Sequence, residues 1–329
     1  MSENAGAMMV ERGSGDRRFL PSSGQLAAYG VAIVVICLPA VLVGSWIFTL
    51  GICFANSIGV LAVSFLLRYG GEVSIGHGFF VAIGAYSVAV TDSHFGLSLL
   101  AGLPAALVLG ILAGVLFAWP SRNISGIYLA VSTMALALAL PEIINNTNSD
   151  WSGGYEGLYV SHGVLPGVPI ALQQYYIPFV LLVIVAYMLG RLRRSRQGIV
   201  LLLARSHSAA ADAFGTRRVW ARVSVMGISC GIAAVSGAAL AFASSTVSPG
   251  GFTLWSSIFL LVGSSVSFYG LTLPRALIGG GFLTLVPQFL SGSGAWIPVL
   301  YGLALLGVIL AGQFAGRIRA ARRRGPEGA

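Results

Sequence analysis

The sequence contains no lysine, and charge of either sign is scarce. Only 9% of its 329 residues are charged and 56% are hydrophobic, whereas about 25% of the residues of a typical soluble domain are charged. A chain with so little charge cannot cover a folded body with a surface that water solvates. The composition therefore excludes a soluble globular protein and predicts a single body embedded in a lipid bilayer.

The absence of lysine also argues against two classes of function. A phosphate-binding loop of the form Gly-x-x-x-x-Gly-Lys requires a lysine, so any ATP must be bound by another polypeptide. All 19 basic residues are arginines, and they lie in short clusters between apolar segments. Because no basic domain exists that could hold a duplex, we expect no nucleic acid partner.

Cysteine and histidine are too few and too scattered to form a catalytic or metal centre. Cys37, Cys53 and Cys230 lie inside apolar stretches without metal-ligand spacing, so we interpret them as small buried hydrophobic residues. The four histidines lie in four different segments, and none pairs with a second ligand. We therefore predict no catalytic residue, no metal and no cofactor, and a protein that is not an enzyme.

Apolar segments of membrane-spanning length recur along the chain. A helix needs about 20 mostly apolar residues to cross the hydrocarbon core. This criterion predicts an all-α polytopic transmembrane helical bundle of about ten spans, at 25–43, 46–67, 78–94, 97–119, 124–144, 174–190, 221–243, 255–271, 275–291 and 297–315. The membrane domain is then 25–315, between a disordered tail at 1–24 and a basic tail at 316–329.

The arginines provide an independent indication of topology. With ten spans and a cytoplasmic N-terminus, every arginine falls in a cytoplasmic segment. The long outer loop 145–173 carries Asp150 and Glu156 and no arginine. This distribution follows the positive-inside rule, so we expect a multi-pass plasma-membrane protein with both termini in the cytoplasm.

A glycine-rich polar stretch at 68–78 interrupts the apolar pattern. Non-helical backbone at membrane depth is tolerated only where it is buried in protein or lines a water-filled cavity, and transporters use such broken helices to hold polar solutes. The residues that this stretch offers to a translocation path are Glu72, Ser74, Gly76 and His77. The alternative is an ordinary cytoplasmic turn in which Arg68 neutralises the glutamate.

Residues 191–220 form the only large predicted cytoplasmic loop, and they contain an amphipathic stretch. Its apolar residues can line one side of a helix while its charged residues point elsewhere, with Gly198 and Gly215 as start and stop signals. A short helix across the cytoplasmic face can transmit motion from a docked partner to the spans. The alternatives are a solvated charged loop and an interfacial helix that touches anionic lipid.

Small residues also recur at four-residue spacing inside the predicted helices. Gly110 with Gly114 and Gly227 with Gly231 are examples. In lipid, this spacing lets two helix backbones approach closely. In a chain with 44 glycines such pairs also arise by chance, so each pair alone is a weak indicator.

Four stretches carry recognisable motifs. Residues 70–86 read GGEVSIGHGFFVAIGAY, residues 152–158 read SGGYEGL, residues 195–215 end in AADAFG, and residues 248–254 read SPGGFTL. In this order the stretches resemble motifs of the membrane-spanning permeases of branched-chain amino acid ABC importers. Two departures are the replacement of an acidic cluster by Ser206-His207-Ser208 and the altered stretch at 263–274.

The resemblance implies a permease subunit of an ATP-driven importer for a small polar solute, such as a branched-chain or related amino acid. The implied partners are a second permease subunit, two cytoplasmic ATPases and an external solute-binding protein, with membrane lipid around the spans. The resemblance adds Gly153, Gly154 and Glu156 to the candidates for the path. It assigns coupling to the ATPase to Arg205, Ala210, Ala211, Asp212 and Gly215.

A self-contained secondary transporter or channel for a small polar solute is the alternative. Such a protein usually places ionisable residues in the middle of a span to couple an ion or a proton. Here Asp92 and Glu142 lie near the outer ends of predicted spans, and Glu72 lies near the inner face. This distribution favours the importer subunit. A membrane-bound enzyme would need a paired nucleophile, base or metal site, which the sequence lacks.

Overall fold

A computed structural model of the chain describes residues 45–123, 126–147, 149–161, 163–165, 167–206 and 217–289, and a few isolated residues between 296 and 307. The predicted first span at 25–43 and both tails lie outside these residues, as does most of the predicted span at 297–315. The described part is an all-α bundle with a single pair of very short strands.

The helices follow the order that the apolar segments predict. They are α2 (Ser45–Phe65) with its π-helical continuation η2 (Leu66–Gly70), α3 (His77–Phe95), α4 (Leu99–Ala118), η3 (Pro120–Asn123), α5 (Ile127–Asn146), α6 (Ser149–Ser152), α7 (Ile170–Arg194), α8 (Arg196–Ser206), α10 (Arg218–Ser244), η4 (Pro249–Gly251), α11 (Leu254–Val266) and α12 (Leu273–Phe289). The strands β1 (Leu158–Tyr159) and β2 (Thr246–Val247) pair antiparallel, with Leu158 opposite Val247.

Six of the described helical segments are long and apolar enough to cross a membrane. They are Trp46–Gly70, Leu99–Ala118, Ile127–Asn146, Ile170–Arg194, Arg218–Ser244 and Pro249–Val266. α3 and α12 occupy two further predicted spans but are not among the six. α11 ends at Val266, before the predicted boundary at 271, because a turn follows in which Phe268 and Tyr269 have positive φ.

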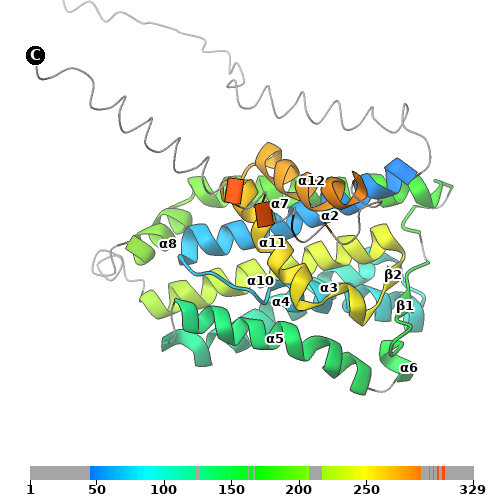
Figure 1. Cartoon of the computed structure of the whole chain (residues 1–329), viewed down its shortest axis with the longest axis horizontal. Coiled ribbons are helices and arrows are strands. Elements are labelled where there is room, and N and C mark those ends of the chain that lie inside the picture. Colours follow the sequence, from blue (N-terminus) through cyan, green and yellow to red (C-terminus); the bar gives the residue numbers. More distant parts are fainter. Residues whose placement is uncertain are drawn as a thin grey trace, which may run out of the picture.

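α10 and α2 form the centre of the bundle (Figure 1). α10 packs against α2, α3 and α4, and α2 also packs against α7 and α12. The outer helices expose large apolar side chains instead, such as Leu116 on α4, Val131 on α5 and Met188 on α7. A surface of this kind is unfavourable in water and suits contact with lipid chains.

The close helix approach that the glycine pairs predict occurs between α4 and α10. A Cβ at Gly110 would lie 3.3 Å from the Cα of Gly231, and a Cβ at Gly114 would lie 3.2 Å from the Cα of Gly227. The two pairs therefore face each other across one interface, where only glycine lets the backbones come so near.

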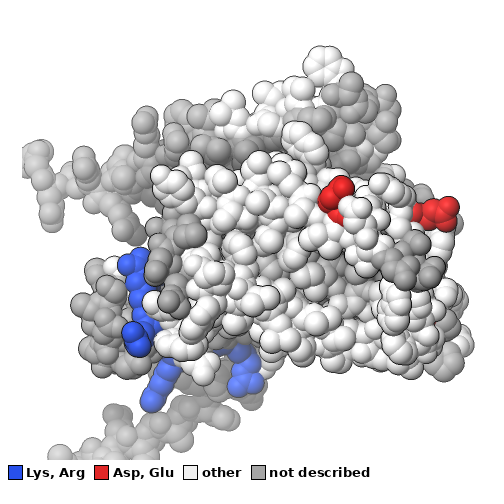
Figure 2. Space-filling model, turned by 90° about the horizontal axis from the view of Figure 1, so that it is seen from below, with Lys and Arg blue, Asp and Glu red and all other residues white. Residues whose placement is uncertain are grey.

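The two ends of the bundle differ in charge. Figure 1 places α8 at one end and α6, β1 and β2 at the other. On the face shown in Figure 2, the arginines gather at the α8 end, the acidic residues lie in the opposite half, and the surface between them carries no charge. We refer to the arginine-rich end as the inner end and to the β1–β2 end as the outer end.

Candidate functional site

The glycine-rich stretch separates η2 from α3. After Gly70 the chain leaves the helix at Gly71, whose φ of 69° is in the left-handed region that glycine adopts without strain. The chain then runs without regular structure as far as Gly76 and enters α3 at His77. We call residues 71–76 the helix break.

The helix break runs from the inner end into the interior of the bundle. Glu72 forms an ion pair with Arg222 near the start of α10, whereas His77 Nε2 lies 2.9 Å from Ser229 Oγ, seven residues further along α10. At 1.5 Å per residue, Ser229 lies about 16 Å from the beginning of α10. At such a depth in lipid, non-helical backbone needs protein partners.

Side chains of neighbouring helices provide those partners. The amide of Ile75 donates to Thr133 Oγ1 of α5 at 3.1 Å, and the amide of Gly78 donates to Ser257 Oγ of α11 at 3.0 Å. A Cβ at Gly76 would lie 2.2 Å from the carbonyl oxygen of Thr133, so only glycine fits there. The deep part of the stretch is therefore enclosed by protein rather than being a cytoplasmic turn.

Two of the candidate side chains are buried in this enclosure. Ser74 is 1% exposed and His77 is fully buried. Ser229 Oγ donates its proton to the carbonyl of Ala62 in α2 at 2.7 Å, so it accepts a hydrogen bond from His77, whose proton must then be on Nε2. His77 thereby links α3 to both central helices, while its Nδ1 has no hydrogen-bond partner among the described residues.

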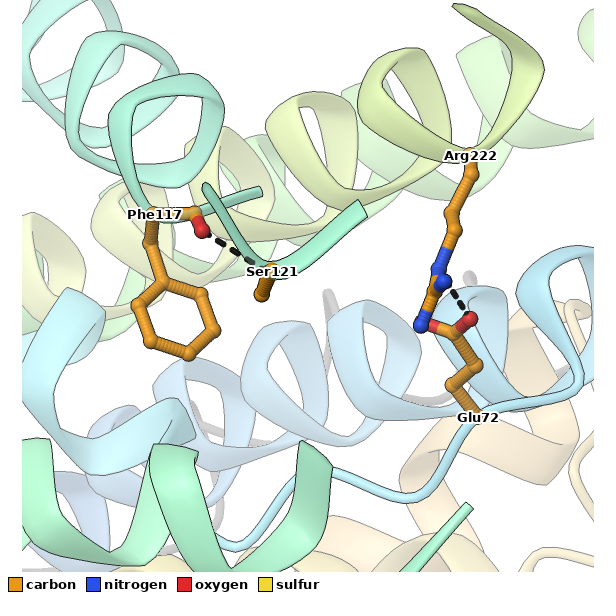
Figure 3. A network of polar contacts seen from close by, with 4 residues as sticks. All are labelled: Glu72, Phe117, Ser121 and Arg222. Atoms are coloured by element: carbon orange, nitrogen blue, oxygen red, sulfur yellow. Dashed lines mark hydrogen bonds and ion pairs between the residues drawn. The ribbon is translucent and has the colours of Figure 1, made fainter. Parts of the chain in front are cut away.

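The shallow part of the helix break contains the Glu72–Arg222 ion pair (Figure 3). The alternative in which Arg68 neutralises Glu72 is wrong, because the structure pairs Glu72 with an arginine 150 positions later in the chain. Burial raises the pKa of the Glu72 carboxyl from its ordinary value, and the nearby Arg222 and Arg218 oppose this shift. Figure 3 also shows Ser121, which donates to the carbonyl of Phe117 and is not linked to the ion pair.

Hydrogen bonds from Arg205 join α8 to the helical turn that precedes the helix break. Nη1 of Arg205 donates to the carbonyl oxygens of Leu67 at 3.1 Å and Arg68 at 2.6 Å. These carbonyls lie at the end of η2, where the helix provides no further amides to bind them. Gly71 leaves room for this contact, because a Cβ there would lie 2.6 Å from Nε of Arg205. We call this contact the Arg205 latch.

The structure places only one of the predicted coupling residues. Arg205 lies in the last turn of α8, whereas Ala210, Ala211, Asp212 and Gly215 are outside the described residues.

The predicted start of the amphipathic helix in this loop, Gly198, is wrong. The Ser195 hydroxyl accepts a hydrogen bond from the Gly198 amide at 3.2 Å and so caps a helix that begins at Arg196.

At the outer end, two of the motif stretches lie beside each other. The SGGYEGL turn leads into β1, which pairs with β2 immediately before the SPGGFTL stretch. Gly153 and Gly154 have φ values of 71° and 52°, and Glu156 in the same turn is exposed. The predicted outer residues are thus brought together with the 248–254 stretch, and they lie at the opposite end of the bundle from Glu72.

The side chains that hold the outer loop were not predicted from the sequence. Gln173, buried near the start of α7, binds four backbone groups within residues 164–168. Asp92 Oδ2 accepts a hydrogen bond from the amide of Ser161 at 2.7 Å. The one available signal was a polar residue, Gln173, in the first turn of an apolar helix, four positions after Pro169.

The buried cysteines and the ionisable groups form no catalytic centre in the described part of the chain. Cys53 and Cys230 are free and buried, as predicted, and Cys37 lies outside the described residues. Among the described residues, no group of three or more His, Cys, Asp or Glu side chains could hold a metal ion. What the described residues show is a discontinuous helix, α2–η2 and α3, that hydrogen bonds from Arg205 join to α8 at the inner end.

Comparison with known proteins agrees with this description. The sequence profile of the family described as branched-chain amino acid transport system permease component matches residues 45–312. The chain is also similar to the high-affinity branched-chain amino acid transport system permease protein LivM of Salmonella typhimurium (strain LT2) and to that of Escherichia coli (strain K12). Each is 24% identical over 227 residues, which cover 61% of this chain and 53% of the relative.

The chain thus spans about half the length of these curated relatives. No solved structure matches it significantly.

Proposed function

Because this chain belongs to the family of permease components of branched-chain amino acid transport systems, we propose that it is a permease subunit of an ATP-driven importer. It is a multi-pass membrane protein, and its role is to form part of the translocation path for a small polar solute. The printed names of the two relatives support a branched-chain or related amino acid as that solute. The partners in this proposal are a second permease subunit, two cytoplasmic ATPases and an external solute-binding protein.

The observation that carries the proposal is the Arg205 latch. α8 directly precedes the predicted coupling segment, and Arg205 joins α8 to the end of η2. The Glu72–Arg222 ion pair joins the next residues of the helix break to α10. A displacement of α8 would therefore reach the helix break and the central helix through direct contacts.

In this mechanism the ATPase acts on the path through a shift between conformations. An ATPase docked on Ala210, Ala211, Asp212 and Gly215 would move α8 when it closes on ATP. The Arg205 latch would carry that movement to the helix break. A displaced helix break would exchange the hydrogen-bond and ion-pair partners of its polar groups, which are Glu72, Ser74, Gly76 and His77. Solute release then follows from the change in population of inward-open and outward-open states. At the outer end, Gly153, Gly154 and Glu156 would lie at the mouth of the path.

The positions of the carboxylates support ATP-driven transport over ion-coupled transport. Asp92 is bound to the outer loop, and Glu72 is paired at the inner end. Glu142 lies in the last turns of α5. Among the described residues, no carboxylate lies midway along a candidate span, where a coupling site for an ion or a proton would be expected.

The test is uptake of radiolabelled leucine by vesicles that contain the reconstituted importer. Wild type is expected to accumulate leucine only when ATP and the binding protein are both supplied. Ala210→Pro and Ala211→Arg are expected to abolish uptake while membrane insertion and ATP hydrolysis persist, whereas the conservative control Ala211→Ser keeps uptake. Normal uptake by both variants would contradict the coupling assignment, and uptake by this chain without ATPases would identify a secondary transporter.

A further inference from the structure

A cavity of about 230 Å³ lies at the inner end, between α8, α10 and the helix break. Its polar lining consists of Arg205, Arg218, Arg222, Glu72 and Tyr69, and its remaining walls are apolar or backbone. A water molecule takes up about 30 Å³ in the liquid. The cavity is therefore large enough for a polar group of several heavy atoms.

The charges in this cavity do not balance. Among the described lining residues, three guanidinium groups face one carboxylate, which leaves an excess of two positive charges. Arg222 pairs with Glu72, and Nη1 of Arg205 binds two carbonyl oxygens. Within the described part of the chain, the Nε and Nη2 donors of Arg205 form no further hydrogen bond and are left for other partners. Arg218 is exposed and forms no ion pair among the described residues.

We propose that this cavity binds a phosphate-bearing anion. Guanidinium groups match the geometry of phosphate oxygens and bind them with charge-assisted hydrogen bonds. A phosphate group would neutralise the excess charge, and the apolar walls leave room for an attached chain. This inference does not depend on the solute or on the ATPases.

Both a lipid headgroup and a soluble phosphate compound present this chemistry at the inner end. Trp220 lies on α10 between Arg218 and Arg222, and its ring is 5.4 Å from that of Trp119. Both rings are about half exposed. Because paired exposed tryptophans are typical of the headgroup level of a bilayer, they place this part of α10 at the depth where anionic lipid headgroups lie.

The test measures ligand affinity from the rise in unfolding temperature of the full chain in a zwitterionic detergent. The probes are phosphatidylglycerol, inorganic phosphate and, as a control, phosphatidylcholine. Arg218→Gln is expected to weaken binding about tenfold, the effect of losing one charge-assisted hydrogen bond, and Arg218→Lys is expected to retain most of the affinity. Glu72→Gln is expected to strengthen binding severalfold, because the excess positive charge rises from two to three.

The matched control is Arg194→Gln, which removes an exposed arginine of the same end that does not line the cavity. Stabilisation by phosphatidylglycerol alone would assign the cavity to a lipid headgroup, and stabilisation by inorganic phosphate as well would show that phosphate itself is sufficient. The proposal fails if neither anion stabilises wild type. It also fails if Arg194→Gln weakens binding as much as Arg218→Gln, or if Glu72→Gln weakens it.

Discussion

Gly71 is required at the inner end for two separate reasons. Its φ of 69° disfavours any residue with a Cβ, at a cost of about 1–2 kcal/mol. In addition, a Cβ at this position would lie 2.6 Å from Nε of Arg205. Because the arginine side chain is long and flexible, it would rotate away from a Cβ at position 71. The hydrogen bonds of the Arg205 latch would then be lost.

Gly96 offers a matched control that separates these two effects. Its φ of 61° imposes the same backbone strain, but a Cβ there would meet no atom within 4 Å. We expect Gly71→Ala and Gly96→Ala to lower the unfolding temperature by similar amounts. Only Gly71→Ala should speed amide hydrogen exchange in α8, because only that variant opens the latch. Equal exchange rates in α8 for the two variants would show that the latch does not hold this helix.

At the residue scale, the sequence identified the helix break but not its partners. Glu72, Ser74 and His77 were recognisable because polar residues among glycines interrupt an apolar run. Their partners Arg222 and Ser229 lie about 150 positions away, and no local pattern connects them. The alternative that paired Glu72 with Arg68 relied on proximity in sequence, which does not imply proximity in space.

At the scale of elements, the long helices were predictable because lipid imposes a minimum length of apolar chain. α4 and α10 lie close to their predicted spans at 97–119 and 221–243. The π-helical end η2, the two-residue strands and the early end of α11 were not predicted. These features depend on contacts with other elements, such as the pairing of Leu158 with Val247.

The α4–α10 interface yields a prediction about packing. A Cβ at Gly114, near the end of α4, would lie 2.6 Å from the Cβ of Cys230 in the middle of α10, so one of the two packed helices would have to shift. We therefore expect Gly114→Ala to destabilise the protein by about 1–3 kcal/mol through overpacking. Gly190 of α7 is the control, since a Cβ there meets nothing within 4 Å and alanine favours the helix.

Unfolding in a denaturing detergent, followed by circular dichroism, would measure both variants. Gly190→Ala should be as stable as wild type or slightly more stable. If Gly114→Ala is also unaffected, the two helices do not pack as closely as the structure places them.

At the scale of the whole molecule, the distribution of charge and the distribution of exposed apolar side chains indicate the same membrane axis, which runs from the inner end to the outer end. Arginines gather at the end that carries α8, exposed carboxylates lie at the end that carries β1 and β2, and the band between them exposes apolar side chains (Figure 2). An orientation with α8 outside would place the arginines on the wrong side of the bilayer. The coupling role of α8 and the lipid-headgroup source for the cavity both require the inner end to face the cytoplasm.

Cysteine labelling tests this orientation directly. Cys53 and Cys230 are buried and should not react, so single cysteines can be introduced once Cys37 is replaced by serine. Tyr155→Cys, at a position that is 81% exposed in the outer turn, should react with a membrane-impermeant maleimide on intact cells. Arg194→Cys, at the inner end of α7, should react only after the membrane is opened or in inverted vesicles. If both cysteines react from the same side, an even number of spans separates position 155 from position 194 instead of the one predicted span at 174–190, and the predicted layout is wrong.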